Sequence, residues 1–267
     1  RIWCSGTIKY QERISMRKFT KTMAAVLSLT MTLTMVTPVF AEGETNITPA
    51  QTTEVVTPTP TPAQPPKNGL FVNEGKTYCY KNGKLVKNKY GYKVKKKYYR
   101  IDKKGVATLV STAEGLAGAR LDKCGGDLKK AFKWSSTKIK YWGSVGKPKK
   151  GQNQVEYYAT YGFKNGKGDC YVMAATFCMM AKVKGYKNVK MVKGTVPQAN
   201  GKNGAHGWCE IKIGKTVYAY DPNFAYTYRN SNVKHHSGYK FTYKMLGKGF
   251  GPVSYTHLRA HETSAHL

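Results

Sequence analysis

The chain has 267 residues, of which 40% are hydrophobic, and it carries 45 Lys and Arg against 14 Asp and Glu, a formal net charge of +31. A chain of this length can bury a core without disulfides, so the composition does not require a disulfide scaffold. The positive charge favours polyanionic partners. We discount nucleic acid, because the charge is mostly dispersed lysine with few arginines to read bases, and no recognition motif is present.

The N-terminal region has the parts of a secretory signal. Met16 is the expected start, so residues 1–15 are interpreted as translated upstream sequence. Residues 16–41 form the predicted signal peptide, in which cationic residues precede an apolar stretch and small residues lead to cleavage after Ala41. The apolar stretch is too short for a membrane span, so we expect a secreted protein, extracellular or cell-wall-associated, with no transmembrane segment in the mature chain.

Residues 42–66 are rich in Thr and Pro and cannot bury a core. We interpret them as an extended linker between the signal peptide and the folded part of the chain.

Residues 67–107 contain two similar units, 75–85 and 96–106, each predicted as an aromatic strand, a turn with Gly and a return strand. The units resemble the choline-binding or glucan-binding repeats of Gram-positive surface proteins. That resemblance implies a β-hairpin segment that binds cell-wall glycans. The alternative is a pair of tyrosine-rich hairpins packed on the following domain, because fewer than three stacked units rarely make a stable array.

Residues 108–251 are the predicted main domain. Its first part, residues 112–142, has apolar residues at helical spacing and is divided in two by adjacent glycines at 125 and 126. Residues 143–153 are expected to be a loop beside the cleft. The candidate core positions are Leu116, Leu121, Leu128, Ala131 and Phe132.

A third helix is predicted directly after Cys170. Residues 171–181 have apolar positions at helical spacing, and Lys184 and Gly185 are typical of a cationic last turn and a C-cap. Cys170 then begins a helix, where the partial positive charge of the helix end favours the thiolate.

Three strands are predicted after this helix, at residues 188–196, 204–213 and 216–220, and the last two form a hairpin. His206 lies early in the first hairpin strand and Asp221 directly after the second. Antiparallel pairing therefore brings both residues to the same end of the sheet.

Cys170, His206 and Asp221 together have the composition of a catalytic triad. A thiolate needs a nearby base, and the base needs a third group to fix its tautomer and orientation. Any one of these residues taken alone is more simply explained by packing. Their joint order and local contexts favour an enzyme.

The cysteine opening a helix, the histidine before Gly-Trp and the aspartate before Pro resemble the transglutaminase-like superfamily. This resemblance implies an α+β fold with a papain-like core, in which a helix bearing the cysteine packs on an antiparallel sheet. It also implies that Cys170 is the nucleophile, His206 the general base and acid, and Asp221 the orienting carboxylate. The expected function is acyl transfer on peptide or protein amide bonds, with hydrolysis favoured over cross-linking. The alternative is a non-catalytic cell-wall-binding or adhesion protein that retains the fold.

The backbone N–H of Cys170 is the natural first donor to an oxyanion. The second donor is left open among Tyr141, Trp142 and Gln154.

Two further cysteines are interpreted as packing residues. Cys178 lies among methionines on the predicted helix. Cys209, three residues after His206, faces the opposite side of a regular strand, with a disulfide as the alternative.

The remaining features concern partners and the chain end. No cofactor or metal is expected, since the His pair at residues 235–236 lacks cysteines at finger spacing. Residues 42–251 keep 38 Lys and Arg against 12 Asp and Glu, which favours wall polyanions as partners beside a peptide or protein substrate. Residues 252–267 differ in composition from the preceding Lys-rich and Gly-rich chain and are interpreted as an adapter-derived tail.

Overall fold

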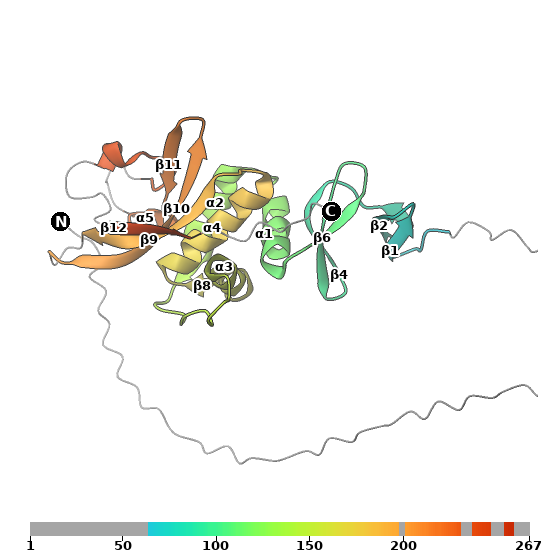
Figure 1. Ribbon diagram of the computed structural model, residues 1–267, viewed down its shortest axis with the longest axis horizontal. Coiled ribbons are helices and arrows are strands. Elements are labelled where there is room, and N and C mark those ends of the chain that lie inside the picture. The colour runs from blue at the N-terminus through green and yellow to red at the C-terminus, as the bar shows by residue number, and fades with distance from the viewer. Residues whose placement is uncertain (1–63, 198–200, 231–236, 247–253, 259–267) are drawn as a thin grey trace, which may run out of the picture. The chain divides into compact units, whose positions relative to one another are not determined.

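The computed structural model describes residues 64–197, 201–230, 237–246 and 254–258 (Figure 1). Within these ranges, no helix is both long enough and apolar enough to cross a membrane. The predictions for residues 1–41, for nearly all of the linker and for the His pair at 235–236 fall outside the described residues.

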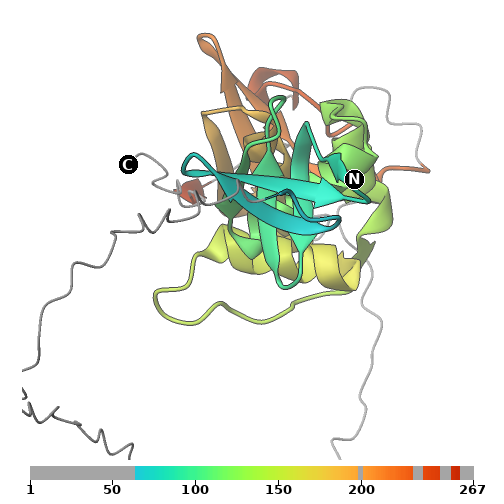
Figure 2. The same ribbon diagram turned by 90° about the vertical axis from the view of Figure 1, so that its right-hand side faces the viewer.

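The first sheet is an antiparallel arrangement of β1 (Gly69–Asn73), β2 (Lys76–Lys81) and β3 (Lys84–Leu85), drawn in blue tones in Figure 2. The two-residue turn between β2 and β3 is Asn82-Gly83, and both residues have positive φ angles of 52° and 74°. This combination is the sequence preference of a tight hairpin turn whose twist matches that of the strands.

The second sheet contains β4 (Lys89–Val94), β5 (Lys97–Ile101) and β6 (Ala107–Val110) in that order. Its last strand continues past the predicted boundary after residue 107. A small buried cluster joins the two sheets: Cys79 comes from the first, and Tyr99, Ile101 and Ala107 come from the second.

The second sheet packs on helix α1 (Thr112–Lys123) through glycines. A Cβ atom added to Gly118 would lie 2.2 Å from the carbonyl oxygen of Tyr90, and one added to Gly91 would lie 2.3 Å from that of Gly115. The Asp122 carboxylate also accepts backbone N–H bonds from Tyr90 at 3.2 Å and from Gly91 at 3.3 Å. This sheet therefore has the packing role that the sequence offered as the alternative to wall binding.

Helix α1 is followed by α2 (Leu128–Lys138), and the two glycines between them both have positive φ. The predicted division of this region is therefore confirmed. Of the five predicted core positions, four are buried, and Leu116 is half-buried.

Helix α3 (Gln154–Asn165) was not predicted. Its signals are nonetheless present in the sequence. Asn153 caps the first turn by accepting the N–H of Glu156 at 2.9 Å, and Gly166 ends the helix in the left-handed conformation.

Helix α4 (Cys170–Lys184) confirms the helix predicted after Cys170, and Gly185 ends it with φ of 113°. It is apolar on nearly all sides, as a central core helix must be. Met173, Phe177 and Met180 are fully buried, and α4 contacts α1, α2, α3, β9 and β10.

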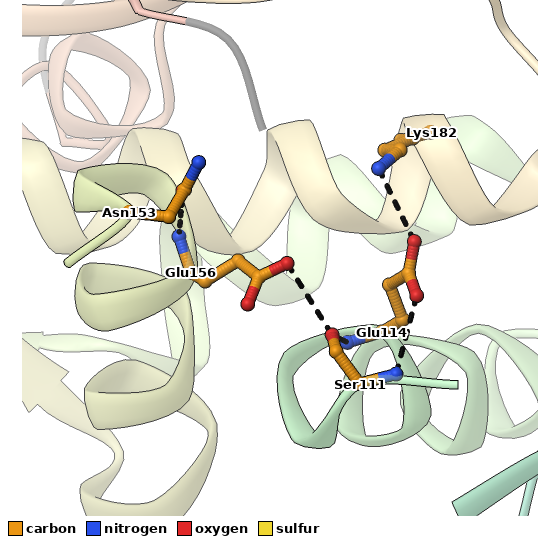
Figure 3. A network of polar contacts seen from close by, with 5 residues as sticks. All are labelled: Ser111, Glu114, Asn153, Glu156 and Lys182. Carbon is orange, nitrogen blue, oxygen red and sulfur yellow. Dashed lines mark hydrogen bonds and ion pairs between the residues drawn. The ribbon is translucent and has the colours of Figure 1, made fainter. Parts of the chain in front are cut away.

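Polar contacts tie α1 to its neighbours (Figure 3). Glu114 completes a capping box with Ser111 and also pairs with Lys182 of α4 at 3.2 Å. The Ser111 hydroxyl donates to Glu156 of α3 at 3.4 Å. These bonds hold α1 and α3 against the buried central helix.

The main sheet is antiparallel, in the order β11, β10, β9, β12. The strands β9 (Val189–Pro197), β10 (Asn203–Ile213) and β11 (Thr216–Tyr220) confirm the three predicted strands within one residue at every end. Strand β12 (Ser254–Leu258) lies in the segment interpreted as a tail, and its backbone pairs with β9. Helices and antiparallel sheet together make the chain α+β.

The smaller elements lie around this sheet. The short strands β7 (Lys140–Tyr141) and β8 (Lys167–Gly168) pair in parallel. Helix α5 (Pro222–Thr227) follows β11, and the short 3₁₀ helix η1 is Tyr243–Leu246.

Candidate active site

Cys170 is the first residue of α4, with 6% of its surface exposed. Asp169 precedes it as the N-cap and accepts the backbone N–H of Val172 at 3.1 Å. This cap leaves Cys170 at the positive end of the helix dipole. Burial raises the pKa of Asp169, although backbone hydrogen bonds and the charge of Lys193 oppose that shift.

His206 lies on β10, opposite Gly194 of β9, and is 5% exposed. Asp221 directly follows β11, and the register that pairs Cys209 with Tyr220 brings it to the histidine. The distance from His206 Nε2 to Asp221 Oδ2 is 2.6 Å. The predicted meeting of the histidine and the aspartate at one end of the hairpin is therefore confirmed.

Asp221 has a second structural role, because it caps helix α5. Its Oδ1 accepts the N–H of Phe224 at 2.9 Å, while its own N–H donates to the carbonyl of Gly238 at 2.6 Å. Both carboxylate oxygens and the backbone are thereby fixed. The carboxylate can hold the imidazole ring of His206 in one orientation without further adjustment.

His206 also shares a hydrogen bond with the side chain of Cys170. The Nε2 atom of the same ring faces Asp221. Burial alone would lower the pKa of His206, but the charge and hydrogen bond of Asp221, assisted by Cys170, raise it well above its usual value. The three predicted site residues thus form one connected chain of polar contacts.

The neighbours of His206 on the same face of β10 support its ring. The ring stacks on Trp208, with centroids 5.9 Å apart and planes at 24°. Trp208 Nε1 donates to the hydroxyl of Tyr243 at 2.8 Å, and that hydroxyl donates to Glu210. The alternation of side chains along a strand puts His206, Trp208 and Glu210 on the same face.

Gly207 faces the other side, toward helix α4. A Cβ atom there would lie 2.5 Å from a ring carbon of Tyr171, so glycine lets the strand approach the start of the helix closely. The sequence-based interpretation used Gly207 and Trp208 as context for the histidine and assigned them no role. The alternation of side chains along a strand could have predicted that Trp208 lies on the same face as His206 and that Gly207 faces the opposite side.

Next to the sulfur, Tyr171 and Lys193 make a partly buried pair. The ammonium of Lys193 lies 4.9 Å from the centroid of the Tyr171 ring and donates to Gln154 Oε1 at 3.3 Å. Burial, followed by the charge of Cys170, raises the pKa of Tyr171 to about 12. The phenol therefore stays neutral at physiological pH.

The structure brings the three candidates for the second oxyanion donor to segments that border Cys170. The backbone N–H of Trp142 donates to the carbonyl of Gly168 at 3.0 Å, and Tyr141 is the register partner of Gly168. Gln154 begins α3 and is bonded to Lys193. The choice among them stays open.

Cys178 and Cys209 lie in the main hydrophobic core as free thiols, 3% and 0% exposed. Burial, followed by a hydrogen bond with Cys178, raises the pKa of Cys209 well above its usual value. Both residues therefore have the packing role predicted for them. Across the described ranges, no group of three or more His, Cys, Asp or Glu side chains could hold a metal ion.

Comparison with known proteins adds one finding. The family model described as the transglutaminase-like superfamily matches residues 110–222, which include Cys170, His206 and Asp221. The curated proteins gave no match to this chain. The matched segment runs from the end of β6 to the first residue of α5.

Proposed function

From the transglutaminase-like domain at residues 110–222, we propose that this protein is an exported, cell-wall-associated thiol enzyme that hydrolyses amide bonds of peptides or proteins. The observation that carries the proposal is the contact chain from Cys170 through His206 to Asp221, with 2.6 Å between the histidine and the carboxylate. A buried imidazole held between a sulfur and a carboxylate is the arrangement that thiol catalysis needs.

In the proposed reaction, the proton of the Cys170–His206 pair starts on the imidazole, as the raised pKa of His206 favours, and the sulfur attacks the amide carbonyl. The negative charge on the carbonyl oxygen is stabilised by the backbone N–H of Cys170 at the helix start. Collapse of this intermediate breaks the C–N bond, and His206 donates its proton to the departing amine. Asp221 stabilises the positive imidazolium through both steps.

The second half of the reaction resolves the thioester. His206, now neutral, accepts a proton from water, and the oxygen attacks the thioester carbonyl. The C–S bond breaks, which releases the acid and returns the proton to the Cys170–His206 pair. The reaction consumes one water molecule and needs no cofactor.

Two charge features favour hydrolysis over cross-linking. Lys193 lies beside Tyr171, and the chain as a whole is strongly basic. A protonated lysine-type acceptor would be repelled from such a site, whereas water is not.

The activity is tested by incubating the protein with a glutamine peptide and a primary amine, followed by mass spectrometry. We expect deamidation or backbone cleavage without amine incorporation, and we expect Cys170→Ala to abolish both. A product that contains the incorporated amine would contradict hydrolysis and show transamidation instead. If neither the wild type nor the variant forms a deamidated, cleaved or amine-bearing peptide, the proposal that the protein is an enzyme is wrong.

The second candidate is a non-catalytic cell-wall-binding protein. It is favoured by the small first sheet, whose strand β2 carries Tyr78 and Tyr80, and by the slight exposure of Cys170, which limits access to the sulfur. Retention on purified cell walls separates anchoring from catalysis. Since β4–β6 packs on α1, the deletion to compare with the full chain is residues 67–86, with thermal melting as a control for folding. Unchanged retention after this deletion would remove the first sheet from wall binding.

A further inference from the structure

The short parallel pair β7–β8 lies immediately before the nucleophile. Lys140 of β7 is the register partner of Lys167 of β8, and Cys170 follows Lys167 by three residues. The backbone bond from Trp142 to Gly168 continues this pairing toward the helix start. The paired strands therefore lead directly into the segment that carries the sulfur.

Two cations gather on one indole ring at this position. The ammonium of Lys167 lies 4.7 Å, and that of Lys140 5.8 Å, from the ring centroid of Trp142. Trp142 is 61% exposed, so the ring offers a flat face to solvent. Cation–π contact holds the ammonium groups near the ring without neutralising their charge.

Placing two like charges side by side on adjacent strands costs stability. Among the described residues, no carboxylate lies within ion-pair distance of Lys140 or Lys167. A third cation, Lys193, lies over the ring of Tyr171, the residue that follows Cys170. The positive charge is therefore concentrated around the segment that carries the sulfur.

We propose that Lys140, Lys167 and the exposed indole of Trp142 form a docking site for acidic side chains of the peptide that supplies the scissile amide. The inference rests on the proposed function, since it names the substrate class of the same site. Carboxylates of Asp or Glu pair with the two ammonium groups, and the apolar part of the peptide lies on the indole. A peptide fits better than a fully hydrated phosphate polymer, because the exposed ring adds apolar contact that such a polymer cannot use.

The same charges select against basic substrates. A Lys-rich peptide would place ammonium groups beside Lys140 and Lys167 and be repelled. Specificity thus comes from a repulsive as well as an attractive effect. Both effects weaken when salt screens the charges, because the site is exposed to solvent.

The experiment compares glutamine peptides that differ only in their flanking residues, acidic, neutral or basic, by measuring kcat/KM with wild type and Lys140→Gln/Lys167→Gln. We expect the acidic peptide to be the best substrate, and the double variant to lose about tenfold in kcat/KM for it, as two partly exposed charge pairs would give. The neutral peptide should be unaffected. Raising the salt concentration should reduce the preference of the wild type.

The matched control is Lys212→Gln/Lys215→Gln, which removes two charges from the far end of the β10–β11 hairpin. Equal losses in both double variants would overturn the docking site, because they would show only the effect of net charge. Equal kcat/KM for acidic and neutral peptides with the wild type would also overturn it.

Binding separates this inference from the activity itself. Fluorescence anisotropy of labelled acidic and neutral peptides with Cys170→Ala reads docking without turnover. Preferential binding of the acidic peptide that disappears on adding Lys140→Gln/Lys167→Gln supports the site even if no peptide is ever cleaved. Lack of preferential binding, or tighter binding of a phosphate polymer at these lysines than of the acidic peptide, would overturn it, even if turnover were observed.

Discussion

Two regions of this molecule are held together in opposite ways. The contact chain of Cys170, His206 and Asp221 consists of polar groups at the ends of buried elements, joined by hydrogen bonds. The junction between the second sheet and α1 consists of glycine backbones, with Gly91 and Gly118 so close to their neighbours that no side chain fits. The first region can lose a polar contact and keep its packing, whereas the second has no space to absorb an added atom.

This difference separates chemistry from stability. Substitutions at the contact chain should change the reaction and leave the fold nearly intact. Substitutions at the glycine junction should destabilise the protein and leave the chemistry of each folded molecule unchanged. A result that mixes the two effects would show that the sheet and the site are coupled.

The largest effect is expected for Asp221→Asn. Asparagine is as good an N-cap as aspartate, so its oxygen can still accept the N–H of Phe224 and the start of α5 should hold. The charge that stabilises the imidazolium of His206 is lost, and we expect the rate to fall about 10³–10⁴-fold. The measurement is kcat on a glutamine peptide together with the melting temperature.

The control for this variant is Asp127→Asn. Asp127 is also a helix N-cap, accepting the N–H of Lys130 at 2.7 Å at the start of α2, and it is remote from the contact chain in sequence. Its activity should be that of wild type. Retention of more than a tenth of the activity by Asp221→Asn would contradict the role given to the carboxylate.

Gly118→Ala should have the largest effect on stability. Alanine is intrinsically about 1 kcal/mol better than glycine inside a helix. Its Cβ would nevertheless lie 2.2 Å from the carbonyl oxygen of Tyr90, so α1 and β4 must separate. We expect a net loss of about 2 kcal/mol in the free energy of unfolding, measured with urea, and no change in kcat for the folded fraction.

The exposed residue Lys123 provides the control on the same helix. Lys123→Ala should change the free energy of unfolding by less than about 0.5 kcal/mol. A stabilised Gly118→Ala variant would mean that the sheet does not pack on α1 as described.

A smaller effect is expected from pH at His206. The pKa of His206 in the folded protein is raised above the usual 6.5. Its charged pair with Asp221 therefore stabilises the fold fully below about pH 6.5, and this stabilisation is lost as the pH rises through the folded pKa. The difference in unfolding free energy between wild type and His206→Gln should therefore decrease from pH 6 upward. If this free-energy difference increased with pH, it would contradict a charged pair between His206 and Asp221.

The smallest effect is expected in the first sheet. Val72 is 65% exposed, so Val72→Ser should change the free energy of unfolding by less than about 0.5 kcal/mol. Urea denaturation beside Gly118→Ala makes the comparison direct. A loss as large as that of the glycine variant would show that the first sheet is packed as tightly as the second.

The sequence predicted the elements whose signals are local. The apolar run after Cys170 and the glycine at its end specify α4, and the alternating residues around His206 specify β10 and its hairpin partner. Since pairing across a short turn fixes the register, the approach of His206 to Asp221 could also be predicted.

The remaining features depend on contacts between distant segments. Helix α3 has cap signals at Asn153 and Gly166, but it mixes polar and aromatic residues, and its buried face is defined by packing against α1 and α4. The pairing of β7 with β8 joins two short segments separated by α3, so the residues of neither segment alone indicate the pairing. In the sequence, Gly118 only indicates a less stable helix. Its packing role becomes evident once the contact with Tyr90 of β4 is known.

The most direct test of the central claim is the alkylation rate of Cys170 at pH 6, with Cys124 as an internal reference thiol that is half-buried in the same protein. Mass spectrometry after brief treatment with iodoacetamide measures both rates at once. If His206 activates the sulfur, Cys170 reacts at least about tenfold faster than Cys124, and His206→Ala removes the difference. Equal rates at the two cysteines, or a fast Cys170 that persists in His206→Ala, would contradict the account.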